Sequence, residues 1–332
     1  MAPPLEYATP QPPEPAGAVN LRSLFSLLGP FIGLIAVFAL FSFLEPQTFP
    51  TIDNMVLLLR TTAVVGVAAL GMTLIIISGG IDLSVGAQIA LSCVTTAWLL
   101  VAGVHPVIAL AGGVASGAVC GLIIGMTITQ IGLLPFIVTL GTFSALRGAA
   151  IGIADGRPIY VTGAKWLRSL LDVNSAILGL PPGVWMLLGL SVLVAAVLRY
   201  TRFGRHVFAV GSNEQTAILC GIPAGRVKVY VYLIGGALAG LAGVLQFSYV
   251  DTGDPTTAGG YELTIIAAVV IGGASLNGGR GSILGTLIGA MIMSMIDNGC
   301  TKHGYANWVQ QIVTGVIIVA AAALDKLRQR AP

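Results

Sequence analysis

Asp82 lies in a distinctive polar segment, Gly79-Gly-Ile-Asp-Leu-Ser-Val-Gly86, between two long apolar stretches of the chain. An ionisable residue in such a place is costly, and it usually faces protein or a water-filled cavity. Asp82, Ser84 and Gly86 could therefore line a solute path or hold a broken helix open. Asp82 could also N-cap a helix that starts near Leu83, and the two roles are compatible.

A second polar segment covers residues 251–281, and its candidate functional residues are Glu262 and Asn277. The segment is polar enough to contact a hydroxylated ligand or a partner, while Glu262 at a helix start has the alternative role of a capping charge. Residues 270–279 (VIGGASLNGG) are similar to residues 77–86 (ISGGIDLSVG). This similarity indicates an internal duplication of the kind many transporters show, or only that glycine-rich hairpins look alike.

A third segment, residues 200–226, is amphipathic and basic. Residues 211–213 predict a turn whose serine or asparagine N-caps a short helix from Glu214 to about Cys220. Gly221 fits the position just after such a helix. A short capped helix between two membrane spans is suited to docking a partner, and an ordinary surface helix is the alternative.

The motifs of catalysis are absent from the sequence. It contains no GxxxxGK[ST] loop, no HExxH, no GxSxG and no Cys/His cluster with ligand spacing. The three histidines are scattered, and the four cysteines show no pairing pattern, which favours a packing role. We therefore expect no catalytic residue, no metal and no cofactor. If the protein moves a solute uphill, another subunit must carry the nucleotide chemistry.

The composition places the chain in a membrane. Only 9% of its 332 residues are charged and 56% are hydrophobic, whereas a soluble protein carries about 25% charged residues. This excludes an ordinary soluble enzyme, a disulfide scaffold and a disordered protein. A net charge of +3 also makes no phosphate-binding surface, so we expect no nucleic-acid partner.

The apolar stretches predict an all-α, polytopic membrane helix bundle of about ten transmembrane helices, with nine or eight as alternatives. The predicted spans are residues 24–44, 55–77, 82–102, 107–129, 134–153, 183–199, 227–250, 261–276, 281–297 and 307–325.

Basic residues predict the orientation of these spans. With ten spans, ten of the sixteen lysines and arginines fall on the side of the N-terminus and four on the other. Because cytoplasmic loops carry the excess of Lys and Arg, both termini are predicted to be cytoplasmic. We expect the proline-rich residues 1–20 to form a disordered cytoplasmic tail, and residues 21–330 to form a single transmembrane domain.

Three stretches resemble a known family in order and separation: SGGIDLSVGAQIALS, AVGSNEQTAILCGI and GYELTIIAAVVIGGASLNGGRGSILGTLIGAMI. They are similar to the ribose-type sugar permeases of bacterial ATP-binding-cassette importers, and the resemblance covers roughly residues 20–330. It implies a permease domain in the bacterial inner membrane. It also implies that residues 200–226 are the loop that engages the ATPase, with Gly204, Asn213, Glu214 and Gly221 as its site residues.

The same resemblance implies the partners. They are two copies of a nucleotide-binding ATPase subunit, a periplasmic sugar-binding protein, and a second permease, either a copy of this chain or a paralogue. The predicted function is import of a sugar or a similar small hydroxylated solute by alternating access. The alternatives are a secondary transporter or channel, and a membrane-embedded enzyme. Intramembrane carboxylates of the kind that couple transport to ions are few here.

Overall fold

The computed structural model describes residues 21–330, and the predicted tail at residues 1–20 lies outside the described residues. Its α-helices are α1 (Leu21–Leu44), α2 (Ile52–Ile77), α3 (Val85–Val101), α4 (Pro106–Ile131), α5 (Pro135–Ile153), α6 (Lys165–Arg168), α7 (Pro182–Tyr200), α8 (Arg202–Ser212), α9 (Glu214–Leu219), α10 (Ala224–Val250), α11 (Tyr261–Ile271), α12 (Ile283–Lys302) and α13 (Asn307–Arg330). A 3-10 turn covers Val173–Ser175, and two short antiparallel strands, β1 (Ile159–Tyr160) and β2 (Thr252–Gly253), pair with each other.

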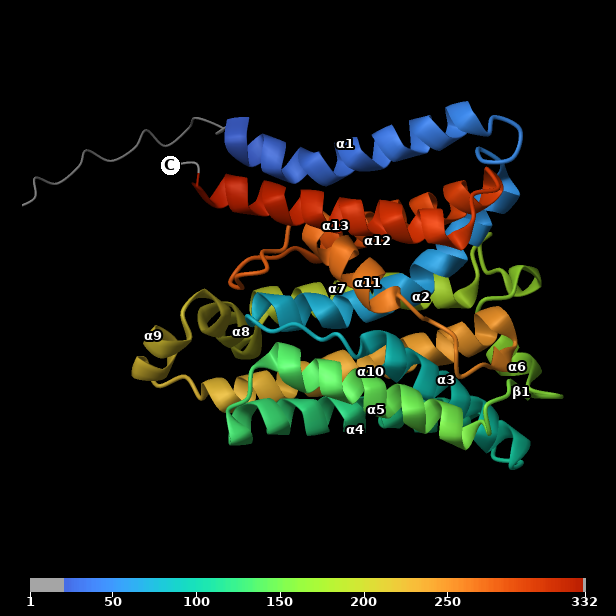
Figure 1. The fold of residues 1–332 in the computed structure, drawn as a ribbon, viewed down its shortest axis with the longest axis horizontal. Helices are drawn as coiled ribbons and strands as arrows, with labels where there is room; N and C mark the ends of the chain where they lie inside the picture. The colour runs from blue at the N-terminus through green and yellow to red at the C-terminus, as the bar shows by residue number, and fades with distance from the viewer. Residues whose placement is uncertain (1–20, 331–332) are drawn as a thin grey trace, which may run out of the picture.

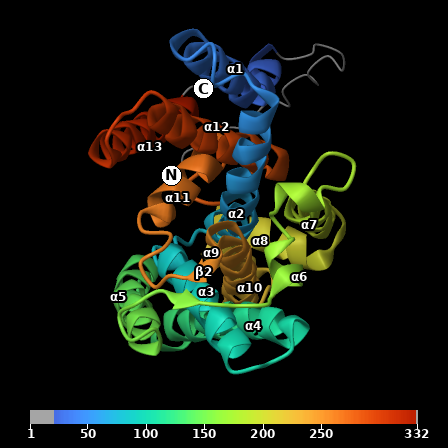
Figure 2. The same ribbon diagram turned by 90° about the vertical axis from the view of Figure 1, so that its right-hand side faces the viewer.

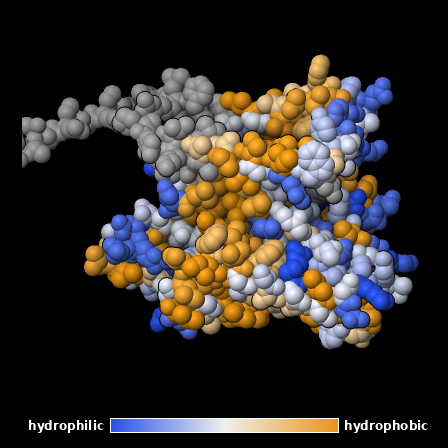
Figure 3. Space-filling model, viewed as in Figure 1, coloured by the Kyte–Doolittle hydropathy of each residue, from blue (hydrophilic) through white to orange (hydrophobic). Residues whose placement is uncertain are grey.

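The all-α membrane bundle is confirmed. Six helices, α2, α4, α5, α7, α10 and α12, are long and apolar enough to cross a membrane, and α1, α3, α11 and α13 contain shorter apolar helices at the other four predicted spans. Figure 3 shows a broad hydrophobic band between two hydrophilic ends of the molecule. One predicted span is too long, because α11 ends at Ile271 rather than continuing to residue 276. Gly272 and Gly273 follow it, and Gly273 has a φ of +93° that an α-helix cannot contain.

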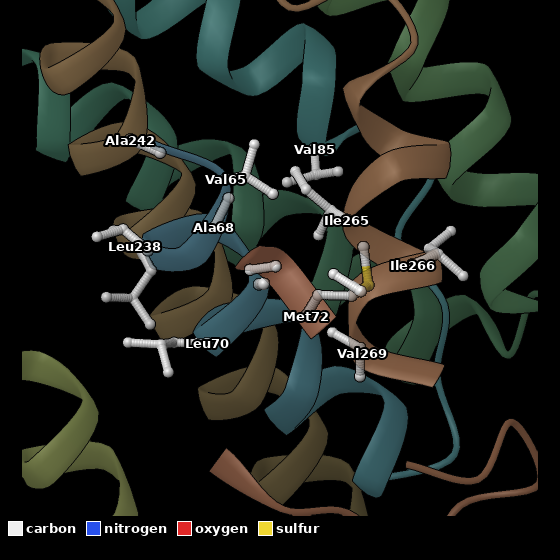
Figure 4. Packing of buried hydrophobic residues seen from close by; sticks show 14 of the residues in the cluster. Val65, Ala68, Leu70, Met72, Val85, Leu238, Ala242, Ile265, Ile266 and Val269 are labelled. Carbon is white, nitrogen blue, oxygen red and sulfur yellow. The ribbon is translucent and has the colours of Figure 1, made fainter. Parts of the chain in front are cut away.

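The core lies around α2, which contacts α7, α10, α11 and α12 and occupies the middle of the bundle (Figure 2). Most of its side chains are buried. Figure 4 shows Val65 and Met72 of α2 among side chains of the neighbouring helices, including Ile266 and Val269 of α11. Because lipid gives helices no hydrophobic reason to associate, close packing of this kind supplies much of the stability.

Helices α4 and α10 pack through glycines. A Cβ at Gly117 would lie 2.6 Å from the Cα of Gly240, and one at Gly121 would lie 3.0 Å from the Cα of Gly236. The glycines of α4 recur every four residues and so form one face of the helix. Small residues at this spacing let two membrane helices bring their backbones into contact.

The bundle has two distinct ends. Helices α8 and α9 project at one end, and β1 and α6 lie at the other (Figure 1). We name them the α8–α9 end and the β1 end. The start of α1 and the end of α13 both lie toward the α8–α9 end (Figure 1). At the β1 end, Arg168 forms an ion pair with Asp251.

Candidate functional site

The segment predicted to engage a partner consists of two short helices. In α8 the side chains of Val207 and Val210 are buried against the bundle, while Arg202 and Arg205 are exposed. The Oγ1 of Thr201 caps this helix by accepting from the backbone N–H of Gly204 at 3.1 Å. An amphipathic helix therefore lies on the end of the bundle with its basic side facing outward.

Helix α8 differs from the prediction, which placed a turn at residues 211–213. The helix continues through Gly211 to Ser212, and the chain turns only at Asn213. A helical signal was present, because Phe203, Val207 and Val210 follow the spacing of one helix face.

The predicted helix that starts at Glu214 is confirmed as α9. The Oδ1 of Asn213 accepts from the backbone N–H of Thr216 at 2.9 Å, so asparagine rather than serine is the N-cap. After the helix, Gly221 has a φ of +81°. Its N–H donates to the carbonyl oxygen of Ile218, and the next amide, that of Ile222, donates to Ala217. This pair of bonds is a Schellman motif, which ends the helix sharply.

The second half of α9 exposes two apolar side chains although the helix lies beyond the membrane helices. Ile218 is 55% exposed and Leu219 is 86% exposed. Glu214 forms an ion pair of 2.6 Å with Lys228 of α10, which ties the start of α9 to the bundle. A cavity of about 750 Å³ lies beside the helix, between Ile218 and the α4–α5 turn at Leu133.

Gly204 plays a different part from the other three site residues predicted for this segment. It is buried, and a Cβ there would lie 2.5 Å from the Cα of Leu198 in α7. Gly204 therefore permits the tight approach of α7 and α8, and it does not lie on the exposed surface.

Asp82 is buried in a closed hydrogen-bond network. It is 2% exposed. Its Oδ1 accepts from the N–H and the O–H of Ser84 at 2.8 and 2.5 Å, and its Oδ2 accepts from the side-chain amide of Gln88 at 2.8 Å. The predicted capping of a helix at Leu83 is wrong, because α3 begins at Val85 and Ser84 occupies the N-cap position. The carboxylate binds the segment before the helix and one side chain within it.

Gly86 and Glu262 bring the starts of two helices together. A Cβ at Gly86, in the first turn of α3, would overlap the carboxylate of Glu262, in the first turn of α11, and would lie 2.8 Å from the carbonyl oxygen of Ala258. The structure thus brings Glu262 next to the hairpin that carries Asp82 and Ser84.

Two polar residues that the sequence did not single out hold the loop before α11. Arg147 of α5 donates to the carbonyl oxygens of Pro255 and Thr257 at 3.0 and 2.7 Å. Gln246 of α10 donates to the Oγ1 of Thr257 at 2.7 Å. Their position inside apolar helices was the available signal, since polar groups there usually have a specific partner.

Asn277 lies elsewhere than Glu262. It lines a cavity of about 310 Å³ together with Ser212 of α8 and Arg280, so it belongs to the α8–α9 end. The two similar segments, residues 77–86 and 270–279, also meet there, because the N–H of Gly279 donates to the carbonyl oxygen of Ile77 at 2.8 Å. Among the side chains that the structure describes, no group of three or more from His, Cys, Asp or Glu is arranged to hold a metal ion.

Comparison with known proteins gives a consistent picture. Residues 54–322 match the family model described as "Branched-chain amino acid transport system / permease component". The chain is 41% identical over 309 residues to the ribose import permease protein of Bacillus subtilis (strain 168). The aligned region covers 93% of this chain and 95% of that protein. It is 38% identical to the ribose import permease protein of Escherichia coli (strain K12), over 90% of this chain and 93% of that one.

A relative named for another sugar is also similar. The D-allose transport system permease protein of Escherichia coli (strain K12) is 34% identical, over 93% of this chain and 94% of that protein. No solved structure matches the chain.

Proposed function

This chain belongs to the ribose-type permeases, the non-catalytic membrane subunits of bacterial ATP-binding-cassette importers, and from that membership we propose that it imports a monosaccharide of the ribose and allose class. The similarity to permeases named for these two sugars extends over almost the whole chain and supports this class. The cargo moves by alternating access, and binding of ATP to the partner subunit supplies the free energy that favours one conformation over the other.

The proposed mechanism depends on the structure of α9. This helix is capped at both ends, is tied to the bundle by the Glu214–Lys228 ion pair, and exposes Ile218 and Leu219 to the space beyond the bundle. A rigid helix with an exposed apolar side is suited to fill a cleft in the ATPase subunit. Asn213 and Gly221 set its two ends, and Gly204 sets the position of α8, through which α9 is attached.

The solute path is proposed to run past the starts of α3 and α11. Gly86 and Glu262 meet there, and the Asp82–Ser84 network lies in the segment that leads to Gly86. Asn277, at the α8–α9 end, belongs to the loop that leads from α11 to α12.

The two ends of the bundle support an orientation and a place for each partner. We infer that the α8–α9 end is cytoplasmic, because it carries exposed arginines of α8 and both described chain ends. One of the two ATPase subunits docks there. A periplasmic sugar-binding protein docks at the β1 end, and a second permease, either a copy or a paralogue, completes the importer.

Reconstitution of uptake tests this function. The permease, its ATPase and its binding protein are placed in proteoliposomes, and uptake of labelled D-ribose and D-allose is measured with ATP. We expect uptake of at least one sugar, and none when the ATPase or the binding protein is omitted. Uptake in the absence of the ATPase would contradict an importer and favour a secondary transporter.

A further inference from the structure

Gly211, in the last turn of α8, has no room for a side chain. A Cβ at this position would overlap the carbonyl oxygen of Ile77 and would lie 2.8 Å from the backbone nitrogen of Gly279. Cβ atoms in proteins essentially never come within 3.0 Å of such groups. The backbone of α8 therefore contacts both the end of α2 and the loop between α11 and α12.

The contact is reciprocal. A Cβ at Gly278 would lie 2.6 Å from the carbonyl oxygen of Gly211 and 3.0 Å from the Cα of Gly79, and one at Gly279 would lie 2.9 Å from the Cα of Ser212. Three backbones thus meet without intervening side chains. We name this meeting point the glycine junction, formed by Ile77, Gly79, Gly211, Gly278 and Gly279.

The junction joins α8 to the beginning of one of the two similar segments and to the end of the other. Residues 77–79 begin the segment that continues to Asp82 and to the start of α3, and Gly278 directly follows Asn277 in the segment that continues to α12. The Gly279–Ile77 hydrogen bond of 2.8 Å connects the two segments to each other. One helix end is therefore in backbone contact with both hairpins at once.

We propose that Gly211 is a positioning residue for energy coupling. Through the glycine junction, α8 transmits a displacement of α9 to both hairpins, and the junction moves as one body. A side-chain contact yields by changing rotamer, whereas backbone contacts at van der Waals distance do not, because protein interiors are close-packed and transmit strain. This inference rests on the proposed function, in which α9 docks on the ATPase.

The substitution Gly211→Ala tests the proposal, with Gly189→Ala as the matched control. Gly189 lies in the helical segment α7, and a Cβ there would contact nothing within 4 Å. Alanine is a better helix former than glycine, so without the junction both substitutions would be harmless. Where they reach the membrane, both variants should co-purify with the ATPase, because α9 is unchanged.

Coupling distinguishes the two variants. The ATPase rate of each complex is measured with and without binding protein loaded with the sugar that supports uptake. We expect the stimulation to fall at least about fivefold for G211A, the lower range of measured coupling between sites, and to be unchanged for G189A. Wild-type stimulation of G211A would overturn the proposal. If the wild-type permease fails to bind the ATPase, the proposed function fails instead.

A second measurement uses the unmodified protein, so it holds even if G211A does not reach the membrane. Hydrogen–deuterium exchange of the Gly279 amide is compared between the nucleotide-free complex and the complex with a non-hydrolysable ATP analogue. If the junction moves as one body, the bond to Ile77 persists and exchange stays slow in both states. Fast exchange in either state would show that the junction opens, and this would overturn the proposal.

Discussion

The carboxylate of Asp82 accepts a hydrogen bond of 2.8 Å from the side-chain amide of Gln88, one turn into α3. Ser84, between them, donates both its N–H and its O–H to the same carboxylate. A buried carboxylate without such donors would be strongly destabilising. The network therefore fixes how the chain enters α3, which in turn places Gly86 beside Glu262.

Substitution of Asp82 separates a structural role from a role of its charge. In Asp82→Asn, the amide oxygen can still accept from Ser84. Gln88, whose Oε1 has no partner among the described residues, can turn its amide so that this oxygen accepts from the new NH₂. We expect wild-type abundance in the membrane for D82N. Asp82→Leu removes both carboxylate oxygens, and each unpaired buried donor costs about 1–3 kcal/mol, so abundance should fall.

Size-exclusion profiles of the solubilised variants, together with uptake, check both expectations. Wild-type abundance of D82L would contradict a stabilising network. Normal abundance of D82N with lost uptake would instead show that the negative charge acts in the solute path.

Local signals in the sequence predicted α9 but not the contacts around it. The cap at Asn213 and the left-handed Gly221 lie within nine residues of each other, so composition and spacing were sufficient. The ten apolar helices were predicted for the same reason. Arg147, in contrast, binds carbonyl oxygens more than a hundred residues away, and nothing local identifies such a partner.

Two errors have physical causes. Asp82 precedes an apolar helix and fits the pattern of an N-cap, but its nearest donors are those of Ser84 and Gln88, so the helix starts later than predicted. In α8, Gly211 normally favours a turn. Here the glycine serves another purpose, because only a residue without a side chain permits the approach of Ile77 and Gly279. This contact depends on the tertiary structure, so the local sequence does not reveal it.

Labelling of Cys220 should report the orientation of the bundle. Cys220 is exposed at the α8–α9 end, whereas Cys93, Cys120 and Cys300 are buried. A membrane-impermeant maleimide should leave Cys220 unlabelled in spheroplasts and label it in inside-out vesicles. The reverse pattern should hold for Leu178→Cys in a Cys220→Ser background, since residue 178 lies between the 3-10 turn and α7 at the other end. Labelling of Cys220 in spheroplasts would contradict cytoplasmic termini.

The exposed apolar side chain of Leu219 should be needed for capture of the ATPase. Leu219 is 86% exposed, so Leu219→Asp should change neither folding nor membrane abundance. Placing a charge in an apolar cleft should nevertheless lower the ATPase recovered with the permease at least about tenfold, the loss expected for a buried interface residue. Leu178→Asp is the matched control, because Leu178 is 87% exposed and distant from α9. Equal recovery with both variants would exclude Leu219 from the docking surface.

Gly221 should tolerate asparagine but not valine. Its φ is +81°, and a Cβ there would meet nothing within 4 Å, so any effect comes from backbone conformation rather than from a clash. Valine in the left-handed region costs about 1–2 kcal/mol, which favours unwinding of the last turn of α9, whereas asparagine adopts this region readily. We expect Gly221→Val to reach the membrane but to lose sugar uptake and stimulation of the ATPase together, and Gly221→Asn to retain both. Uptake and ATPase assays on the co-purified complexes measure this. Equal loss in the two variants would mean that the missing side chain, and not the left-handed turn, is what the partner requires.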